Sequence, residues 1–258
     1  MRYTDLIRLD GRGFVVLGAG QGIGEQVVHA LSQCGARLLC VDNNEERGLE
    51  VAASVGGFAF VADITKRAEV ERVFQEAAKF FGGRVDGIVD VVGMPLGGGL
   101  AQMDDNEWQR QFDLVISHAW FALQFGPPLM AQGGSVVFVG SMAGTVARSG
   151  SLLAYGAAKA ALHHLVKGAA QELAVRGIRV NAVAPGLTRT PRLDLANAQS
   201  FWDEQSAQIP LGRPASTSDI AAGVLFLASP MSAHVTGTIL AIDGGASLGM
   251  QRGIARSG

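Results

Sequence analysis

The chain has 258 residues and a formal net charge of −2, and it contains no run rich in Lys and Arg, so nucleic acid and anionic membrane surfaces are not expected as partners. It is 48% hydrophobic, yet no apolar run reaches the roughly 18 residues of a membrane span, and the start "MRYTDLIRLDGRG" lacks the core of a signal peptide. Cys34 and Cys40 have neither metal-ligand spacing nor a partner cluster, so we expect a cytoplasmic protein without a metal site.

Short apolar runs rich in β-branched residues alternate with longer amphipathic stretches. In chain order they predict a strand at 13–18, a helix at 22–34, strand 36–42, helix 44–54, strand 57–62, helix 66–81, strand 85–92, helix 105–130, strand 134–140, helix 153–176, and strands 178–184 and 237–243. We therefore expect an α/β fold, a Rossmann-like doubly wound parallel sheet of about seven strands with helices on both faces. A single domain over 1–258 is expected, with loosely ordered ends at 1–11 and 247–258.

A glycine-rich loop, "LGAGQGIGEQVV" (17–28), joins the first predicted strand to the first predicted helix. Gly18, Gly22 and Gly24 have the spacing G-x-x-x-G-x-G. Glycine at this turn lets a pyrophosphate approach the backbone, and the helix start offers free N–H groups to the anion. A flexible turn is the alternative, but the strand–loop–helix context favours a dinucleotide site.

Asp42 ends the second predicted strand. A carboxylate there accepts hydrogen bonds from both hydroxyls of the adenosine ribose and repels a 2′-phosphate. Asn43 and Asn44 follow, and position 21 is Gln rather than Lys or Arg, so NAD is favoured over NADP. The other role open to Asp42 is to cap the next helix, which does not exclude ribose binding.

Tyr155 and Lys159 lie four residues apart in "LLAYGAAKAALHHL" (152–165), which is rich in Ala and Leu and predicts a helix. They share one helical face, as such pairs also do by chance. Beside a dinucleotide site the pair has a chemical use. Alcohol oxidation needs a base for the hydroxyl proton, and a tyrosine, whose ordinary pKa is about 10, becomes one when a nearby ammonium favours the phenolate.

Further motifs follow in a fixed order. They are "VADIT" (61–65), "GSMAG" (140–144), Tyr155-x-x-x-Lys159, "IRVNAVAPGLTRTP" (178–191), "LFLAS" (225–229) and "GTILAIDGG" (237–245). With the glycine loop, they make the chain resemble the short-chain dehydrogenase/reductase family over about residues 12–246. The resemblance implies hydride transfer between a nicotinamide cofactor and a small molecule.

The resemblance also implies roles for individual residues. Tyr155 would be the acid/base, Lys159 would lower its pKa and hold ribose hydroxyls, and Ser141 would bind the substrate oxygen. The residues expected to contact the cofactor are Gly18, Gly20, Gln21, Gly22, Ile23, Gly24, Asp42, Asn43, Ala62, Asp63, Ile64, Val91, Val92, Gly93, Tyr155, Lys159, Pro185, Gly186, Leu187 and Thr188.

Within that set, the resemblance places Asp63 near the adenine and Thr188 against the nicotinamide carboxamide, in a pocket shaped by Pro185 and Gly186. Two departures from the family pattern are minor. Leu17 replaces the usual Thr, and Ser141 precedes Tyr155 by one residue more than usual, which a loop absorbs readily.

Two further departures bear on the chemistry. "DVVG" (90–93) replaces the usual Asn-Asn-Ala-Gly, so Asp90 is either a substitute polar anchor or a structural buried acid. Val115 stands where the family has an asparagine that anchors a water for proton relay, and valine cannot bind that water. His118, one turn later, is either a partial substitute or a polar residue in a helix–helix contact.

The remaining candidates concern the substrate and the surface. Adjacent helical residues diverge by about 100°, so His163 and His164 are not expected to share a metal. Residues that would line an apolar substrate pocket, or simply pack on the body, are Arg148, Leu152, Leu153, Leu193, Leu195, Phe201 and Trp202. Apolar walls favour a hydrophobic secondary alcohol or ketone, for example a cyclic or steroid-like one.

We therefore expect an NAD-dependent alcohol dehydrogenase or ketone reductase. The helices at 105–130 and 153–176 resemble those of the family's subunit interface, so a homotetramer is expected. Two alternatives stay open. One is an NADPH-dependent reductase of the 3-oxoacyl type, against which Asp42 argues. The other is a dinucleotide-binding protein with little activity, suggested by Val115 and "DVVG".

Overall fold

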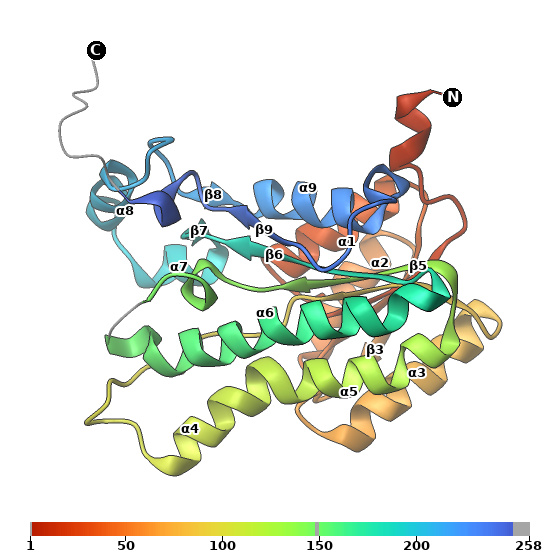
Figure 1. The fold of residues 1–258 in the computed structure, drawn as a ribbon, viewed down its shortest axis with the longest axis horizontal. Coiled ribbons are helices and arrows are strands. Elements are labelled where there is room, and N and C mark those ends of the chain that lie inside the picture. The colour runs from red at the N-terminus through yellow and green to blue at the C-terminus, as the bar shows by residue number, and fades with distance from the viewer. Residues whose placement is uncertain (1, 148–149, 250–258) are drawn as a thin grey trace.

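Seven parallel strands form the central sheet, in the order β3-β2-β1-β4-β5-β6-β9 (Figure 1). The computed structural model describes residues 2–147 and 150–249. The strands are β1 (Gly13–Leu17), β2 (Arg37–Asp42), β3 (Phe58–Val61), β4 (Val85–Asp90), β5 (Met130–Val139), β6 (Arg179–Pro185) and β9 (Ile239–Ile242). The expected Rossmann-like sheet is confirmed.

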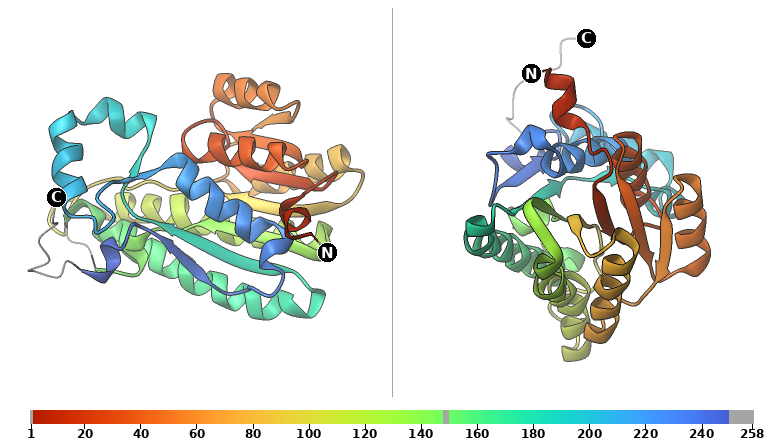
Figure 2. Two further views of the ribbon diagram at one scale, coloured as in Figure 1. Left: turned by 90° about the horizontal axis from the view of Figure 1, so that it is seen from above. Right: turned by 90° about the vertical axis from the view of Figure 1, so that its right-hand side faces the viewer.

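Helices cover both faces of this sheet (Figures 1 and 2). One face carries α1 (Ile23–Gln33), α2 (Glu45–Ser54) and α9 (Thr217–Ala228), and the other carries α3 (Arg67–Phe81), α5 (His118–Phe125) and α6 (Leu153–Leu173). Helix α4 (Asp105–Phe112) packs beside α6. Each face buries its own apolar core, which explains why the strands lack polar–apolar alternation. Within the described residues, no helix is long and apolar enough to cross a membrane.

The strand order reverses direction at β1. The chain moves outward from β1 through β2 to β3, then crosses to β4 on the other side of β1. The connections that leave β1 and β4 therefore turn to opposite faces, which opens a crevice at the carboxyl ends of these strands. The glycine loop follows β1, and Asp90 is the last residue of β4.

The predicted helix at 105–130 is interrupted and shorter than expected. Helix α4 ends at Phe112, a π-helical turn spans Asp113–Ser117, and α5 ends at Phe125. Gly126 and Pro127 stop the helix, since proline has no backbone N–H to continue it. Strand β5 consequently begins at Met130, four residues before the predicted start. Val115 lies on the π-helical turn and is fully buried.

The expectation of loosely ordered ends is wrong for most of the amino-terminal segment. Tyr3–Ile7 forms a 3-10 helix, and Leu9 is fully buried with its N–H bonded to the Cys34 carbonyl at 2.7 Å. The apolar Leu9 side chain anchors this segment to the core. At the other end, Ala246–Leu248 forms a 3-10 turn, and residues 250–258 lie outside the described part of the chain.

Two short helices, α7 (Pro191–Ala196) and α8 (Gln199–Ala207), lie between the two strands of a small sheet, β7 (Thr188–Arg189) and β8 (Ala215–Ser216). Thr190 caps α7, because its side chain accepts the Leu193 N–H. The segment between β6 and α9 therefore leaves the main sheet and returns to it.

Candidate active site

The glycine loop has the backbone conformation that its sequence predicted. Gly18 and Gly22 have φ of +81° and +62°, a region that favours glycine. Gly24 packs directly on the Gly18 carbonyl, where any side chain would overlap it. Helix α1 starts at Ile23, and no side chain of its N-cap residue, Gly22, occupies its first N–H groups.

The Asp42 carboxylate holds this loop in place. Its Oδ2 accepts the Gly20 N–H at 2.8 Å, and its Oδ1 accepts the Asn44 N–H at 2.9 Å. A Cβ on Gly20 would lie only 2.7 Å from Asp42 Oδ2, so glycine is required there. The capping alternative for Asp42 is wrong, because Asn44 caps α2 by accepting the Arg47 N–H. Each carboxylate oxygen keeps a further lone pair for a ligand.

A cleft of about 310 Å³ runs from this loop along the ends of β1, β2 and β4. Predicted residues that line it are Gly18, Gln21, Gly22, Ile23, Asp42, Asn43, Ala62, Asp63, Ile64, Val91, Val92 and Gly93. Residues that line it without having been predicted are Val41, Arg47, Thr65, Met94, Leu114, Thr190, Pro191 and Arg192. Arg47 lies only five residues after Asp42, which was the available signal. Val41, Thr65 and Met94 are next to predicted residues, and Thr190 and Pro191 lie within the motif at 178–191, so these had a signal as well. Leu114 and Arg192 had none.

The cleft fits a dinucleotide. Its glycines form a cradle that a Cβ would fill, which suits a pyrophosphate, and two carboxylates, Asp42 and Asp63, also line it, which suits ribose hydroxyls. Asp63 accepts hydrogen bonds from the Thr65 side chain at 2.6 Å and from the Thr65 N–H at 3.2 Å. These bonds, and Lys66 at 3.2 Å, lower the pKa of Asp63. Gly20 and Gly24 do not line the cleft; they pack behind the residues that do.

Ser141, Tyr155 and Lys159 come together beside the carboxyl end of β5. Ser141 accepts the Ala143 N–H at 3.1 Å and hydrogen-bonds with Tyr155. Burial raises the pKa of Tyr155 to about 12, and the Ser141 hydroxyl opposes that shift. Lys159 Nζ lies 5.6 Å from the centre of the Tyr155 ring. One helical face thus presents a phenol and an ammonium together.

Lys159 is almost completely buried, with 1% of its surface exposed. Its Nζ donates to the Val139 carbonyl at 2.7 Å. Burial lowers the pKa of Lys159 to about 8, while the negative charge of Asp90 opposes this. A Cβ at position 93 would lie 2.8 Å from Lys159 Nζ, so the lysine would have to shift, and the φ of +141° at Gly93 also favours glycine.

Asp90 and His118 form a buried pair next to this lysine. His118 Nε2 lies 3.1 Å from each Asp90 oxygen, but only Oδ1 has hydrogen-bond geometry. Oδ1 also accepts the Val92 N–H at 3.1 Å. Val115, where the resemblance placed an asparagine, is 3.6 Å from the Cβ position of Gly93. Asp90 is thus a buried acid that also anchors the loop after β4 through the Val92 N–H, so the two alternatives for this residue do not exclude each other.

His163 and His164 have different surroundings, as their helical separation predicted. His164 is exposed, whereas His163 is buried against the Ser141 segment. Ser141 N–H points to His163 Nε2 at 3.4 Å, and Thr145 Oγ1 lies 3.4 Å from Nδ1. Burial, followed by the charges of Lys159 and Lys167, lowers the pKa of His163 to about 4. Among the described residues, no group of three or more His, Cys, Asp or Glu could hold a metal ion.

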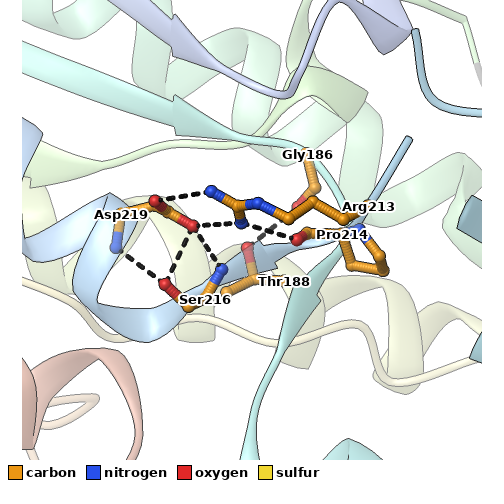
Figure 3. Close-up of polar contacts among 6 residues, drawn as sticks. All are labelled: Gly186, Thr188, Arg213, Pro214, Ser216 and Asp219. Carbon is orange, nitrogen blue, oxygen red and sulfur yellow. Dashed lines mark hydrogen bonds and ion pairs between the residues drawn. The ribbon is translucent and has the colours of Figure 1, made fainter. Parts of the chain in front are cut away.

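The turn from Pro185 to Thr188 does not line the cleft itself. Thr188 Oγ1 donates to the Gly186 carbonyl at 3.2 Å, and β7 pairs with β8 (Figure 3). Beside it, Arg213 makes a bidentate contact with Asp219 at 2.6 and 3.1 Å, which helps hold the pKa of that carboxyl well below its usual range. Leu187 is held in this turn because its carbonyl accepts the Ala215 N–H at 2.9 Å.

The expected apolar lid is only partly formed. Trp202 is buried and meets Phe201 edge to face, but Leu195 is 91% exposed. Leu153 borders a shallow groove with Gly98 and Gly99, close to the start of α6. Arg148 lies outside the described residues. The structure therefore gathers twelve of the predicted cofactor residues around one cleft and places Ser141, Tyr155 and Lys159 beside one another. The substrate side is less defined.

Comparison with known proteins places this site among reductases and dehydrogenases. A family model described as "Enoyl-(Acyl carrier protein) reductase" matches residues 18–247. Galactitol 2-dehydrogenase (L-tagatose-forming) of Cereibacter sphaeroides is 36% identical, covering 95% of this chain and 98% of its own. The 3-oxoacyl-[acyl-carrier-protein] reductase of Thermotoga maritima is 31% identical, covering 93% and 99%. A solved 7α-hydroxysteroid dehydrogenase, complexed with NADH and 7-oxo glycochenodeoxycholic acid, has a TM-score of 0.89 at 30% identity, covering 98% and 99%.

Proposed function

The chain belongs to the short-chain dehydrogenase/reductase family of oxidoreductases, and from that premise we propose that it interconverts a secondary alcohol and a ketone with NAD(H). The observation that carries this proposal is the buried ammonium of Lys159 beside the phenol of Tyr155, with the Ser141 hydroxyl on the same phenol. The similarity to a galactitol dehydrogenase and to a hydroxysteroid dehydrogenase supports alcohol–ketone chemistry.

Tyr155 is the acid/base in this proposal. Its burial alone favours the neutral phenol, which suits proton donation to a ketone oxygen. For alcohol oxidation the phenolate is needed, and the charge of Lys159 stabilises it. The Ser141 hydroxyl accepts the Ala143 N–H and hydrogen-bonds with Tyr155, so it lies where a substrate oxygen would meet the phenol and can donate to that oxygen instead. NAD(H), when bound, supplies the hydride donor or acceptor.

The glycine loop and α1 would hold the pyrophosphate, and Asp42 would bind the adenosine ribose. Asp42 supports NAD over NADP, because its carboxylate repels a 2′-phosphate. The other predicted contacts stand as part of the same proposal: Asn43, Ala62, Asp63 and Ile64 around the adenosine, Val91, Val92 and Gly93 on the β4 side, and Pro185, Gly186, Leu187 and Thr188 beside the nicotinamide.

One observation favours a second candidate, an NADPH-dependent reductase of the 3-oxoacyl type. Arg47 lines the cleft at the same end as Asp42, and a guanidinium there would attract a 2′-phosphate. The similarity to a 3-oxoacyl reductase points the same way. We rank it second because Asp42 is fixed by two backbone N–H groups at the ribose position, whereas Arg47 is held there by no described contact of its guanidinium.

We further propose a homotetramer with a cytoplasmic location. Trp108 and Trp120, on α4 and α5, are 42% and 49% exposed, which is unusual for tryptophan on a free surface. Burial of these two rings between subunits would explain their exposure on the single chain. Light scattering of the purified protein measures the subunit number directly, and a monomer at micromolar concentration contradicts the tetramer.

The function is tested by replacing Tyr155 with Phe. NADH oxidation and NAD reduction are followed by absorbance with a panel of polyols, cyclic and steroid-like alcohols and their ketones. Tyr155→Phe is expected to lower turnover at least about 1000-fold while NADH binding persists. Tyr3→Phe is the matched control, because Tyr3 is the chain's other tyrosine and is 80% exposed. NADH binding without turnover of any panel member would instead support the dinucleotide-binding protein with little activity.

A further inference from the structure

Lys159 is a buried cation whose hydrogen bonds do not neutralise it. Its contact at Nζ is the Val139 carbonyl, a neutral acceptor. A buried charge is strongly disfavoured unless a counter-charge lies nearby. Within residues 2–147 and 150–249, Asp90 is the one carboxylate among the buried side chains. The opposite charge available to Lys159 inside the protein is therefore that of Asp90.

The charged and titratable groups around Lys159 come from three elements. On its own helix are Tyr155 and His163, and the Lys159 charge itself disfavours the protonated form of His163. From β4 comes Asp90, the group that opposes the effect of burial on Lys159. From α5 comes His118, which contacts Asp90. Asp90 is the only negative one of the four.

His118 fixes how the Asp90 carboxylate is presented. Its Nδ1 lies 3.3 Å from the Asp113 carbonyl, which only accepts, so Nδ1 carries the hydrogen. Its Nε2 faces a carboxylate that is also an acceptor. The pair is therefore best satisfied when one proton is shared between Nε2 and Asp90, which withdraws part of the carboxylate's negative charge. Asp90 Oδ2 is left buried with no hydrogen bond.

We propose that Asp90 and His118 are positioning residues that set the proton affinity of Lys159: Asp90 supplies its counter-charge, and His118 moderates that charge by sharing a proton with it. The proposal deepens the function proposed above, because Lys159 must be charged to stabilise the Tyr155 phenolate. The packing supports it: Lys159 Nζ lies 2.8 Å from the Cβ position of Gly93, only three residues after Asp90.

The decisive measurement does not require activity. The chain has only four lysines, Lys66, Lys79, Lys159 and Lys167, so lysine labelled with ¹³C at Cε gives four signals that can be followed against pH by NMR. Lys159→Met identifies its signal by deletion. In the parent protein the Lys159 signal is expected to titrate near pH 8, as its lowered pKa of about 8 requires.

Asp90→Asn is expected to lower the Lys159 midpoint by about one pH unit or more, because only the counter-charge is lost. Asp86→Asn is the matched control on the same strand: Asp86 pairs with Arg84 and the Gly13 N–H, and its loss should leave the Lys159 midpoint in place. A midpoint unchanged in Asp90→Asn, or one shifted equally by Asp86→Asn, overturns the proposal.

His118→Gln is the second variant, and it decides the question should Asp90→Asn not fold. Glutamine keeps an N–H donor but cannot share a proton with Asp90. A Lys159 midpoint above the parent's supports the proposal, and a midpoint equal to or below it overturns the proposal. Loss of packing alone would not move the two variants in different directions. Where the NMR midpoints move as expected but no substrate turns over, the inference stands and the proposed function fails.

Discussion

Asp42 and Asp90 occupy equivalent positions on two strands that flank β1, yet their surroundings differ. Each is the last residue of its strand, and each accepts through Oδ1 the N–H two residues later, at 2.9 Å from Asn44 and 3.1 Å from Val92. The two carboxylates differ in the contacts of their second oxygen, Oδ2. Asp42 Oδ2 accepts the Gly20 N–H in a half-buried loop, whereas Asp90 Oδ2 is buried without a hydrogen bond. The first carboxylate therefore has the setting that the proposed ribose contact requires, and the second has the setting of the proposed counter-charge.

The largest effect is expected when Lys159, the cation that Asp90 faces, is replaced. Lys159→Met is expected to lower turnover about 100- to 1000-fold, because the Tyr155 phenolate loses its stabilising charge. Steady-state kinetics against pH should show the remaining activity moved to higher pH, since the tyrosine then gives up its proton less readily. Lys167→Met, on the exposed side of the same helix, is the control and should retain full turnover. Equal losses in both variants would contradict a specific role for Lys159.

The other carboxylate should control the cofactor rather than the chemistry. Asp42→Ser is expected to weaken NADH binding about 10- to 100-fold, as loss of hydrogen bonds to a charged acceptor predicts, and to improve NADPH binding. Fluorescence titration with both cofactors measures the change. Adding Arg47→Gln to Asp42→Ser should remove the gain in NADPH affinity, because Arg47 lines the same end of the cleft. An unchanged preference would mean that Asp42 serves only the loop.

His163 extends the comparison to a buried group with no carboxylate partner. Its pKa falls from 6.5 to about 4 in the folded protein. Between these values the unfolded chain binds more protons than the native one, so the free energy of unfolding falls as pH decreases through this range. Between pH 7.5 and 5.5 the loss from His163 should be about 1 kcal/mol. Denaturant unfolding of His163→Leu should show a weaker acid dependence by this amount, and His164→Leu, at an exposed position, should not.

The smallest effect concerns Val115, beside Gly93 and Lys159. Val115→Asn is expected to raise turnover by up to about threefold if proton transfer to solvent limits the rate, because an amide can hold a water there. Turnover in normal and deuterated water reports whether a proton step is limiting, and a thermal melt checks that the variant is folded. Unaltered turnover together with a large solvent isotope effect would show that the proton leaves by another path.

Much of the cofactor site followed from the sequence, because its parts are local. Gly18, Gly22 and Gly24 lie within one turn, and a strand–loop–helix segment brings them together whatever the rest of the chain does. Asp42 could be placed because parallel strands end at one edge of the sheet. Arg192 and Leu114, by contrast, reach the same cleft from segments that are distant in sequence, and no spacing in the chain indicates it.

The sequence by itself determined the sheet, the glycine cradle and the Tyr155–Lys159 pair, because strand periodicity, glycine conformation and helical spacing are set by neighbouring residues. It left Asp90 and His118 as open alternatives, and it predicted a continuous helix where a π-helical turn occurs. Only the tertiary structure decided that these two residues, 28 positions apart, meet beside Lys159. The reason is that burial and charge pairing depend on which elements pack together, and no local pattern encodes the distance between them.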